Sequence, residues 1–196
     1  MFTGIIETMG RVEAATKSAG GMRLSVGAPG LALKMGDSIA VNGVCLTAVD
    51  VRNRGFDADV VLETLAKTNL GELDIGTRVN LERPMAADGR FDGHIVQGHV
   101  DGVGQIASVE VEGDGRRIRV RSPRNLSKYI ATKGSISLDG ISLTIAAVAG
   151  DEFEVAIIPH TLANTTLGIR TPGSRVNMEV DVIAKYVERM MSGGPK

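Results

Sequence analysis

Two histidines, His94 and His99, lie five residues apart in the sequence GHIVQGHVDG. Imidazole titrates near neutral pH, so a histidine in such a loop can move a proton. His99 is the first choice for proton transfer or ligand contact, and the alternative is a histidine hydrogen-bonded within a turn. The pair could also begin a zinc site, but the sequence presents no third and fourth ligands. We therefore expect no metal, and we expect His94 to hold the loop.

The single cysteine, Cys45, also has two interpretations. It could act as a nucleophile or a proton relay, or it could be a small buried residue, as many free cysteines are. One cysteine excludes an internal disulfide and a zinc cluster built from cysteines. It also suits a reducing compartment.

The residues around Cys45 occur twice in the chain. VNGVCLTAVD (Val41–Asp50) matches LDGISLTIAA (Leu138–Ala147) at an offset of 97 residues. That offset holds without a gap from 38–82 to 135–179. The beginnings of the two copies, FTGIIETMGRV and VQGHVDGVGQI, match at an offset of 94. A repeat of this length predicts two homologous domains, because solenoid repeats are much shorter.

Each copy has the pattern of β structure. Asn42-Gly43 interrupts an alternating apolar and polar run, as in a tight hairpin, and Asp139-Gly140 repeats the signal. TLAKTNLGEL and TLANTTLGIR each predict one helical turn that ends in a left-handed cap at Gly71 or Gly168. Short strands with regularly spaced glycine-rich turns favour a closed barrel, which leaves no sheet edge.

We divide the chain into a first barrel (1–88), a second barrel (89–182) and a C-terminal oligomerisation helix with its tail (183–196). The polar, glycine-rich stretch PMAADGRFDG (Pro84–Gly93) links the barrels.

The C-terminal segment predicts a short amphipathic helix. Ile183, Tyr186, Val187 and Met190 form an apolar stripe at helical spacing. So short a helix is marginal alone and must pack on something, for which a neighbouring subunit is a good candidate. Asp181 precedes the helix and is either its N-cap or a residue near the reaction centre.

The composition limits the classes of partner. The formal net charge is −1, and four Phe, two Tyr and no Trp provide few stacking platforms. Neither nucleic acid nor an anionic membrane is therefore an expected partner. The N-terminus lacks the charged and apolar regions of a signal peptide, and no stretch reaches a membrane span of about 18 apolar residues. We expect a cytoplasmic protein.

Five sets of motifs together resemble the riboflavin synthase alpha chain family: MFTGI, the pair NGVCLT and DGISLT, ETLAKTNLG, GHIVQGHVDG and IPHTLANTTLG. The resemblance runs from Met1 to the C-terminal helix. It implies an all-β fold of two tandem homologous six-stranded Greek-key barrels followed by a short C-terminal helix.

The resemblance also implies an activity. Enzymes of this family transfer a four-carbon unit between two molecules of 6,7-dimethyl-8-ribityllumazine, giving riboflavin and 5-amino-6-ribitylamino-uracil without cofactor or metal. It implies a homotrimer whose active sites lie between the N-barrel of one subunit and the C-barrel of the next, with lumazine synthase as a further protein partner. A reaction between two copies of one molecule needs two similar pockets, which a duplicated domain supplies.

The chemistry asks mainly for orientation. Stacking two reactants in register can contribute roughly 7–11 kcal/mol in the best cases. The 7-methyl group of the lumazine is already acidic, so modest proton relays suffice, in agreement with the lack of a cluster of catalytic carboxylates. Hydroxyl and backbone groups suit a neutral pteridine and its ribityl chain.

Motif matching implies the site residues. The N-barrel pocket would be lined by Ser38, Cys45, Thr47, Asp59–Val61 and Thr64, and the C-barrel pocket by His99, Ser142, Thr144, Ile158 and Thr161. The expected catalytic residues are His99, Ser38, Cys45 and Asp181. The expected substrate-binding residues are Phe2, Thr3, Gly4, Ser38, Val44, Cys45, Thr47, Asp59, Val61, Thr64, Gly98, His99, Val100, Asp139, Ser142, Thr144, Ile158 and Thr161.

The main alternative is a non-catalytic lumazine- or flavin-binding protein of the same fold. Its second copy would be expected to lose pocket residues, whereas this chain keeps His99, Ser142, Thr144 and Thr161. A flavin-binding barrel of a reductase would need a nucleotide-binding domain, and no strand–GxGxxG–helix unit follows here. Both points favour the enzyme.

Overall fold

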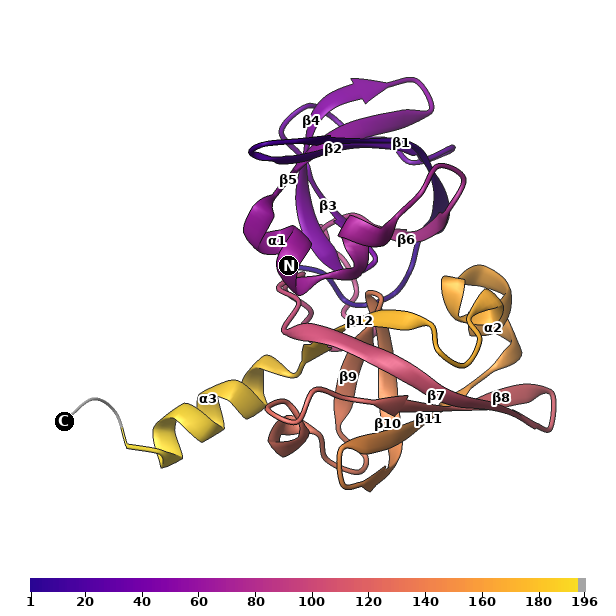
Figure 1. Ribbon diagram of the computed structural model, residues 1–196, viewed down its shortest axis with the longest axis vertical. Coiled ribbons are helices and arrows are strands. Elements are labelled where there is room, and N and C mark those ends of the chain that lie inside the picture. The colour runs from indigo at the N-terminus through magenta and orange to yellow at the C-terminus, as the bar shows by residue number, and fades with distance from the viewer. Residues whose placement is uncertain (194–196) are drawn as a thin grey trace.

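The computed structural model describes residues 1–193 and consists mainly of two closed β-barrels, one above the other in Figure 1. The N-barrel contains β1 (Thr8–Ser18), β2 (Gly21–Gly27), β3 (Ser38–Val41), β4 (Val44–Arg52), β5 (Gly55–Val61) and β6 (Arg78–Glu82). The C-barrel contains β7 (Gly102–Glu112), β8 (Gly115–Arg121), β9 (Ser135–Leu138), β10 (Ile141–Ala149), β11 (Glu152–Ile157) and β12 (Arg175–Val180).

The strand order is the same in both barrels. It runs β1-β2-β5-β4-β3-β6 in the first and β7-β8-β11-β10-β9-β12 in the second, with all neighbours antiparallel. The last strand of each barrel returns to lie between its first and third strands, as in a Greek key. The predicted all-β architecture of two tandem six-stranded barrels is therefore confirmed.

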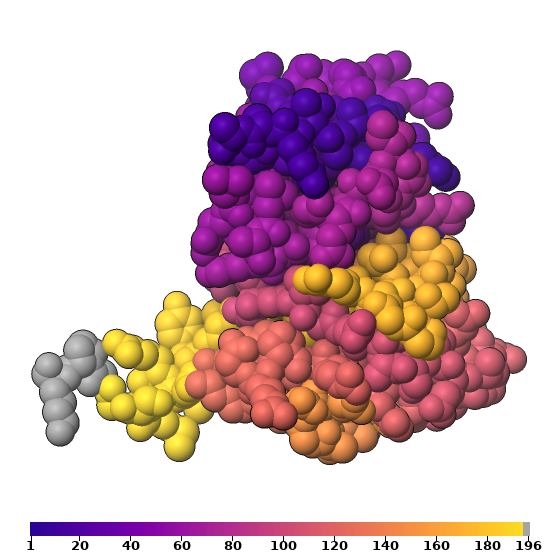
Figure 2. All heavy atoms as spheres, viewed as in Figure 1, coloured from indigo at the N-terminus to yellow at the C-terminus, as the bar shows by residue number. Residues whose placement is uncertain are grey.

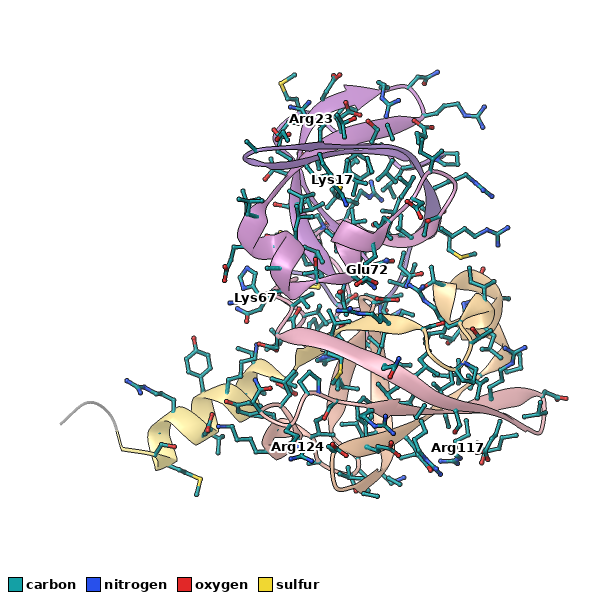
Figure 3. All side chains as sticks on the ribbon, in the orientation of Figure 1. Lys17, Arg23, Lys67, Glu72, Arg117 and Arg124 are labelled. Atoms are coloured by element: carbon teal, nitrogen blue, oxygen red, sulfur yellow. The ribbon has the colours of Figure 1, made fainter. Side chains whose placement is uncertain are left out.

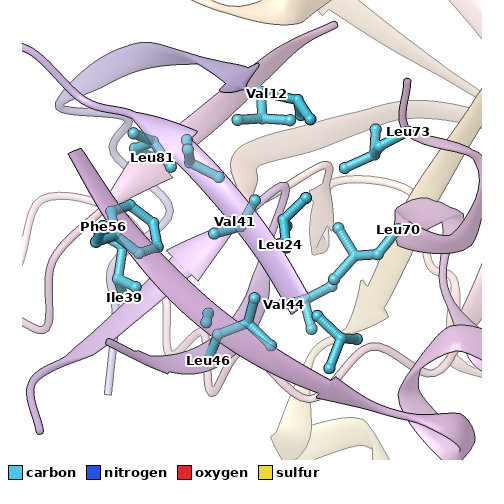
Figure 4. Packing of buried hydrophobic residues seen from close by; sticks show 14 of the residues in the cluster. Val12, Leu24, Ile39, Val41, Val44, Leu46, Phe56, Leu70, Leu73 and Leu81 are labelled. Atoms are coloured by element: carbon cyan, nitrogen blue, oxygen red, sulfur yellow. The ribbon is translucent and has the colours of Figure 1, made fainter. Parts of the chain in front are cut away.

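Each barrel closes around its own apolar core. Alternate residues point inward along each strand, so that Leu24, Ile39 and Phe56 are fully buried in the first barrel (Figure 4). Ile118 and Phe153 are fully buried in the second. Charged side chains such as Arg23 and Arg124 lie on the outer faces, as Figure 3 shows. Two separate cores agree with two domains that arose from one repeat.

The predicted hairpin turns are confirmed. Asn42 and Gly43 have φ values of 45° and 75°, and Asp139 and Gly140 have values of 45° and 82°. Two consecutive positive φ angles define the turn type that Asn-Gly and Asp-Gly favour. The turns also touch each other, because a Cβ on Gly43 would lie 2.6 Å from the backbone nitrogen of Gly140. The same two turns thus close a hairpin in each barrel and join the barrels.

The helical stretches differ from the prediction. They are α1 (Leu62–Lys67), η1 (Asn69–Glu72), η2 (Ser127–Tyr129), α2 (Pro159–Asn164), η3 (Thr166–Ile169) and α3 (Val182–Met191). The prediction of left-handed caps at Gly71 and Gly168 is wrong. Helices α1 and α2 are followed by the extended residues Thr68 and Thr165, and a 3₁₀ turn that contains the glycine comes next in each case. Each threonine hydroxyl accepts a hydrogen bond from the new turn, and a Cβ on Gly168 would overlap the carbonyl of Leu162.

The C-terminal helix α3 is confirmed and projects from the barrels (Figures 1 and 2). Asp181 is its N-cap, because Oδ1 accepts a hydrogen bond from Ile183 N at 2.9 Å. Tyr186 and Met190 expose 67% and 80% of their surface. Residues 194–196 of the predicted helix-and-tail segment lie outside the described residues. Within residues 1–193, no helix is long and apolar enough to cross a membrane.

The segments that precede the two barrels exchange partners. Ile6 packs on the core of the C-barrel, and Val100 packs on the core of the N-barrel. Between these contacts, Phe2 and Val96 pair as an antiparallel bridge. Each barrel therefore receives part of its packing from the segment that leads into the other barrel. We call residues 1–7 and 94–101 the crossing segments.

Candidate functional site

Several of the predicted N-barrel residues lie near the place where β4 and β5 stop pairing, which we call the N-barrel opening. Ser38 on β3 lies directly opposite Thr47 on β4. The pairing of β4 with β5 runs only from Arg52 back to Ala48, where its partner is Ala58. Thr47, Cys45 and the end of β5 lie beyond the paired part. Strands β4 and β5 therefore separate next to Thr47 and Cys45, two of the residues expected at the site.

Both edges of this opening carry polar groups. Thr47 and Asp59 are exposed, and Thr64 on α1 is half-buried. The carboxylate of Asp59 accepts a hydrogen bond from Arg23 at 2.6 Å. Val61, at the end of β5, is exposed as well, so the opening also offers an apolar contact.

The C-barrel has the same opening. The pairing of β10 with β11 begins at Ile145 and Val155, so Ser142 and Thr144 on β10 lie beyond it. Ile158, directly after β11, is exposed, and Thr161 on α2 is half-buried. The chain therefore presents two equivalent openings.

The crossing segments close the inner ends of both openings. The carbonyl of Gly98 accepts a hydrogen bond from Cys45 N at 2.9 Å, and that of Gly4 accepts one from Ser142 N at 2.8 Å. A Cβ on Gly4 would lie 2.6 Å from the Ser142 Cβ, and one on Gly98 would lie 2.6 Å from the Cys45 Cβ. Both glycines also have positive φ values. No other residue type fits at either position without strain.

This exchange places His99 differently from our expectation. The repeat grouped His99 with Ser142, but the preceding residue, Gly98, lies against Cys45 of the N-barrel. Val100 packs on the N-barrel core, and His99 is exposed. Sequence matching assigns a residue to the repeat in which it lies. It does not show which of the two barrels the residue contacts.

Two buried glutamates, which our sequence reasoning did not select, hold the crossing segments. Glu179 accepts hydrogen bonds from the backbone N–H groups of Gln97, Gly98 and His99 at 2.7, 2.9 and 3.0 Å. Burial raises the pKa of Glu179, and its hydrogen bonds oppose that effect. The sequence does contain a signal for these residues, because Glu82 and Glu179 occupy the same place in the two repeats, at the end of an apolar strand.

Glu82 does the same for the N-terminal segment. It accepts hydrogen bonds from Thr3 N at 2.6 Å, Thr3 Oγ1 at 2.8 Å and Gly4 N at 3.0 Å. Burial raises the pKa of Glu82, and the hydrogen bonds from Thr3 and Gly4 oppose this. Phe2 is fully buried against Ala40 and Val96. Phe2, Thr3 and Gly4 are therefore all fixed by buried contacts.

Two further predicted residues, Val44 and Asp139, are buried. Val44 belongs to the N-barrel core. Asp139 is fully buried between the barrels, where its carboxylate accepts hydrogen bonds from Arg170 at 2.6 Å, Asn177 N at 2.8 Å and Asn69 at 2.9 Å. Burial raises the pKa of Asp139, and Arg170 opposes the effect. The structure thus assigns Asp139 contacts at the barrel interface.

Ser38 and Asp181 lie in two equivalent clefts. A cleft of about 590 Å³ on the N-barrel is lined by Thr3, Ile5, Ser38 and Glu82, among others. A cleft of about 550 Å³ on the C-barrel is lined by Ser135, the counterpart of Ser38, together with Asp181 and one face of α3. Both clefts combine apolar, hydroxyl and charged groups.

His94 ties its crossing segment to the C-barrel. Its Nδ1 lies 2.7 Å from Ser142 Oγ, and its backbone N–H donates to the carbonyl of Thr3 at 3.2 Å. Among residues 1–193, no group of three or more His, Cys, Asp or Glu residues is arranged to hold a metal ion.

Known proteins are similar to this chain in sequence and in fold. A family model described as "Lumazine binding domain" matches residues 3–84 and again residues 97–181. The riboflavin synthase of Mycobacterium bovis is 49% identical over 197 residues, covering 97% of this chain and 98% of the relative. That of Photobacterium phosphoreum is 44% identical and covers 97% and 89%, and that of Bacillus subtilis is 43% identical and covers 97% and 90%.

Solved structures agree on the fold. A crystal structure of LumP complexed with riboflavin superposes with a TM-score of 0.86 at 26% identity, covering 92% of this chain and 99% of LumP. LumP complexed with 6,7-dimethyl-8-(1'-D-ribityl) lumazine gives a TM-score of 0.84 at 24% identity, with the same coverage. The second likeness supports the two-barrel fold alone.

Proposed function

The chain belongs to the riboflavin synthase family, and on that premise we propose that it converts two molecules of 6,7-dimethyl-8-ribityllumazine into riboflavin and 5-amino-6-ribitylamino-uracil. The observation that carries the proposal is the pair of lumazine binding domains in one chain. A reaction in which one lumazine gives four carbons to another needs two binding sites of similar shape, and orientation supplies much of the rate.

We assign one lumazine to each barrel, with the divisions 1–88 and 89–182. The hydroxyls of Thr47 and Thr64 would bind the heterocycle at the N-barrel opening, and those of Thr144 and Thr161 would do so at the C-barrel opening. The support is their place beside the ends of β4 and β10 that do not pair with β5 and β11.

His99 is the proposed proton-transfer group of the N-barrel site. Its backbone is fixed beside Cys45 by Glu179 and by the Gly98 carbonyl, while its side chain stays exposed. Cys45 would line the pocket, and Ser38 and Asp181 would contact the ligands from the two clefts.

We propose that the protein is a homotrimer in which the N-barrel site of one subunit faces the C-barrel site of the next. The support is the family resemblance and the apolar stripe of α3, where Ile183, Tyr186, Val187 and Met190 are all exposed. Lumazine synthase, as supplier of the substrate, is a proposed partner. A cytoplasmic location is proposed because Cys45 is free.

The test is incubation of the purified protein with 6,7-dimethyl-8-ribityllumazine alone. Riboflavin should appear at half the molar rate at which lumazine disappears, and His99→Ala should turn over slowly with unchanged circular dichroism. A stoichiometric, fluorescent complex without turnover would instead make the protein a lumazine carrier. Turnover that His99→Ala leaves unaffected would remove His99 from the mechanism.

A further inference from the structure

The contact between His94 and Ser142 joins the second crossing segment to the C-barrel opening. His94 is 8% exposed, and Ser142 is half-buried on the part of β10 that pairs with β9 but not with β11. Their Nδ1 and Oγ atoms are 2.7 Å apart, which is a short hydrogen bond. Gly93, which precedes the histidine, permits the approach, because a Cβ there would lie 3.2 Å from the Ser142 Cβ and would overlap the carbonyl of Thr3.

The surroundings of the imidazole favour its neutral form. Burial lowers the pKa of His94, and the negative charge of Asp181 opposes this effect. The other groups that face the histidine are the hydroxyl of Ser142 on β10 and the backbone carbonyl of Thr3 in the first crossing segment. Asp181 at the start of α3 is thus the charged group that acts on the ring. A neutral imidazole has one ring nitrogen that can accept a proton.

The two openings differ at this point. Cys45 is the counterpart of Ser142, and a crossing-segment glycine covers each of them in the same way. Within residues 1–193, however, no histidine is hydrogen-bonded to Cys45. The imidazole partner therefore distinguishes the C-barrel opening from its N-barrel counterpart. A reaction that treats two identical molecules differently requires such a difference.

We propose that Ser142 and His94 form a proton relay for the lumazine bound at the C-barrel, a role that rests on the proposed function. Ser142 Oγ donates its hydrogen to His94 Nδ1. When the oxygen takes a proton from the ligand, for which the acidic 7-methyl group is the candidate, the hydroxyl proton passes to Nδ1 and forms an imidazolium. Ser142 is then the catalytic residue, and His94 is the positioning residue that accepts its proton.

The relay balances over one turnover. Two lumazine molecules contain the same atoms as riboflavin and 5-amino-6-ribitylamino-uracil together, so the reaction releases no net proton. The proton held by His94 therefore returns through Ser142 to the products before they leave. No oxidant, reductant or metal enters this cycle.

The test uses His94→Asn, His94→Ala and Ser142→Ala in the full-length protein. Asparagine can place its side-chain oxygen near the position of Nδ1 and accept the Ser142 hydrogen bond, but it cannot hold a proton near neutral pH. We expect kcat of His94→Asn to fall roughly 10²-fold with KM changed less than about twofold, since general acid–base groups contribute at least this much. The decline of the wild-type kcat at acid pH, where His94 is protonated, should disappear in this variant.

A purely structural role gives a different result. His94→Asn would then restore the wild-type kcat and leave its acid decline in place, while His94→Ala would lose both fold and activity. That outcome overturns the relay although wild-type turnover stands. Absence of wild-type turnover would instead contradict the proposed function.

A spectroscopic measurement tests the relay without turnover. In histidine-labelled protein, the ¹⁵N signal of His94 Nδ1 should be that of an unprotonated, hydrogen-bonded nitrogen, and Ser142→Ala should shift it. A proton on Nδ1 would reverse the hydrogen bond, leave Ser142 without a base and refute the proposal.

Discussion

Asn80 and Asn177 occupy equivalent places on β6 and β12, and their side chains cross the barrel interface in opposite directions. Asn80 Nδ2 donates to the Asp139 carbonyl in the C-barrel turn at 2.9 Å. Asn177 Nδ2 donates to the Asn42 carbonyl in the N-barrel turn, also at 2.9 Å. Both asparagines are fully buried. The turns that connect the two strands of each hairpin therefore also accept hydrogen bonds from the other barrel.

Replacing Asn177 by alanine should destabilise the protein through this interface. The change leaves the Asn42 carbonyl and the backbone N–H of Asn69 buried without their partners, and each such group costs roughly 1–3 kcal/mol. Urea unfolding should therefore show a loss of about 2–6 kcal/mol, by the same reasoning. Asn53→Ala, in an exposed turn, is the control. Equal stability of the two variants would contradict the role of Asn177.

The close contact of the two turns gives a second prediction, for Gly43→Ala. The substitution adds a Cβ 2.6 Å from the Gly140 nitrogen at a positive φ. Gly150→Ala is the matched control, because Gly150 has a φ of 65° but nothing within 4 Å of a new Cβ. The control should lose about 1–2 kcal/mol from backbone strain alone, and Gly43→Ala should lose clearly more. Similar losses in thermal unfolding would mean that the turns separate at little cost.

Glu179 gives a prediction about pH. Burial raises its folded-state pKa above the ordinary 4.5, against the hydrogen bonds from Gln97 and Gly98 and the charge of Lys185, while Asp101 adds to the rise. Between 4.5 and the raised value, the folded state binds more protons than the unfolded state, so stability falls as pH increases. The stability of wild type relative to Glu179→Gln should therefore decrease as pH rises through this window.

Urea unfolding at a series of pH values measures that difference. Glu110→Gln, at an exposed position of β7, controls for the loss of one carboxylate. If the stability of wild type relative to Glu179→Gln instead increased with rising pH, the argument that burial raises the pKa of Glu179 would be contradicted. Because Glu179 holds the backbone of His99, turnover of Glu179→Gln should also fall even at a pH where the variant is stably folded.

The exposed stripe of α3 gives a prediction about assembly. Val187→Asp places a charge in the stripe and should convert the proposed trimer into monomers in sedimentation velocity experiments, because burial of an unpaired carboxylate is unfavourable. Arg189→Asp carries the same new carboxylate outside the stripe and should remain assembled. A trimer in both variants would show that another surface joins the subunits.

Much of the architecture could be predicted from the repeat. Two matching halves gave two barrels, Asn42-Gly43 and Asp139-Gly140 gave the turns, and the apolar spacing after Asp181 gave α3. These features are local, since each depends on the conformations that neighbouring residues allow.

The partners of the crossing segments could not be predicted in this way. The repeat aligned His99 with Ile5 and suggested a place beside Ser142, whereas the chain crosses to Cys45. Asp139 likewise has the sequence signal of a turn residue, but its burial depends on contacts with Asn69 and Arg170 from distant parts of the chain. Such contacts are tertiary, and spacing along one chain does not encode them.

Because the crossing segments are exchanged, a substitution in one half of the chain affects the other half. A substitution at Gly4 alters the wall beside Ser142 in the other half, and one at Gly98 alters the wall beside Cys45. A change in one half of the chain therefore alters the packing of the other half, since each half supplies backbone beside the matched residue of the other. A substitution that makes the two openings differ must therefore be compatible with the packing of both barrels. The contact of the His94 imidazole with Ser142 is one such difference.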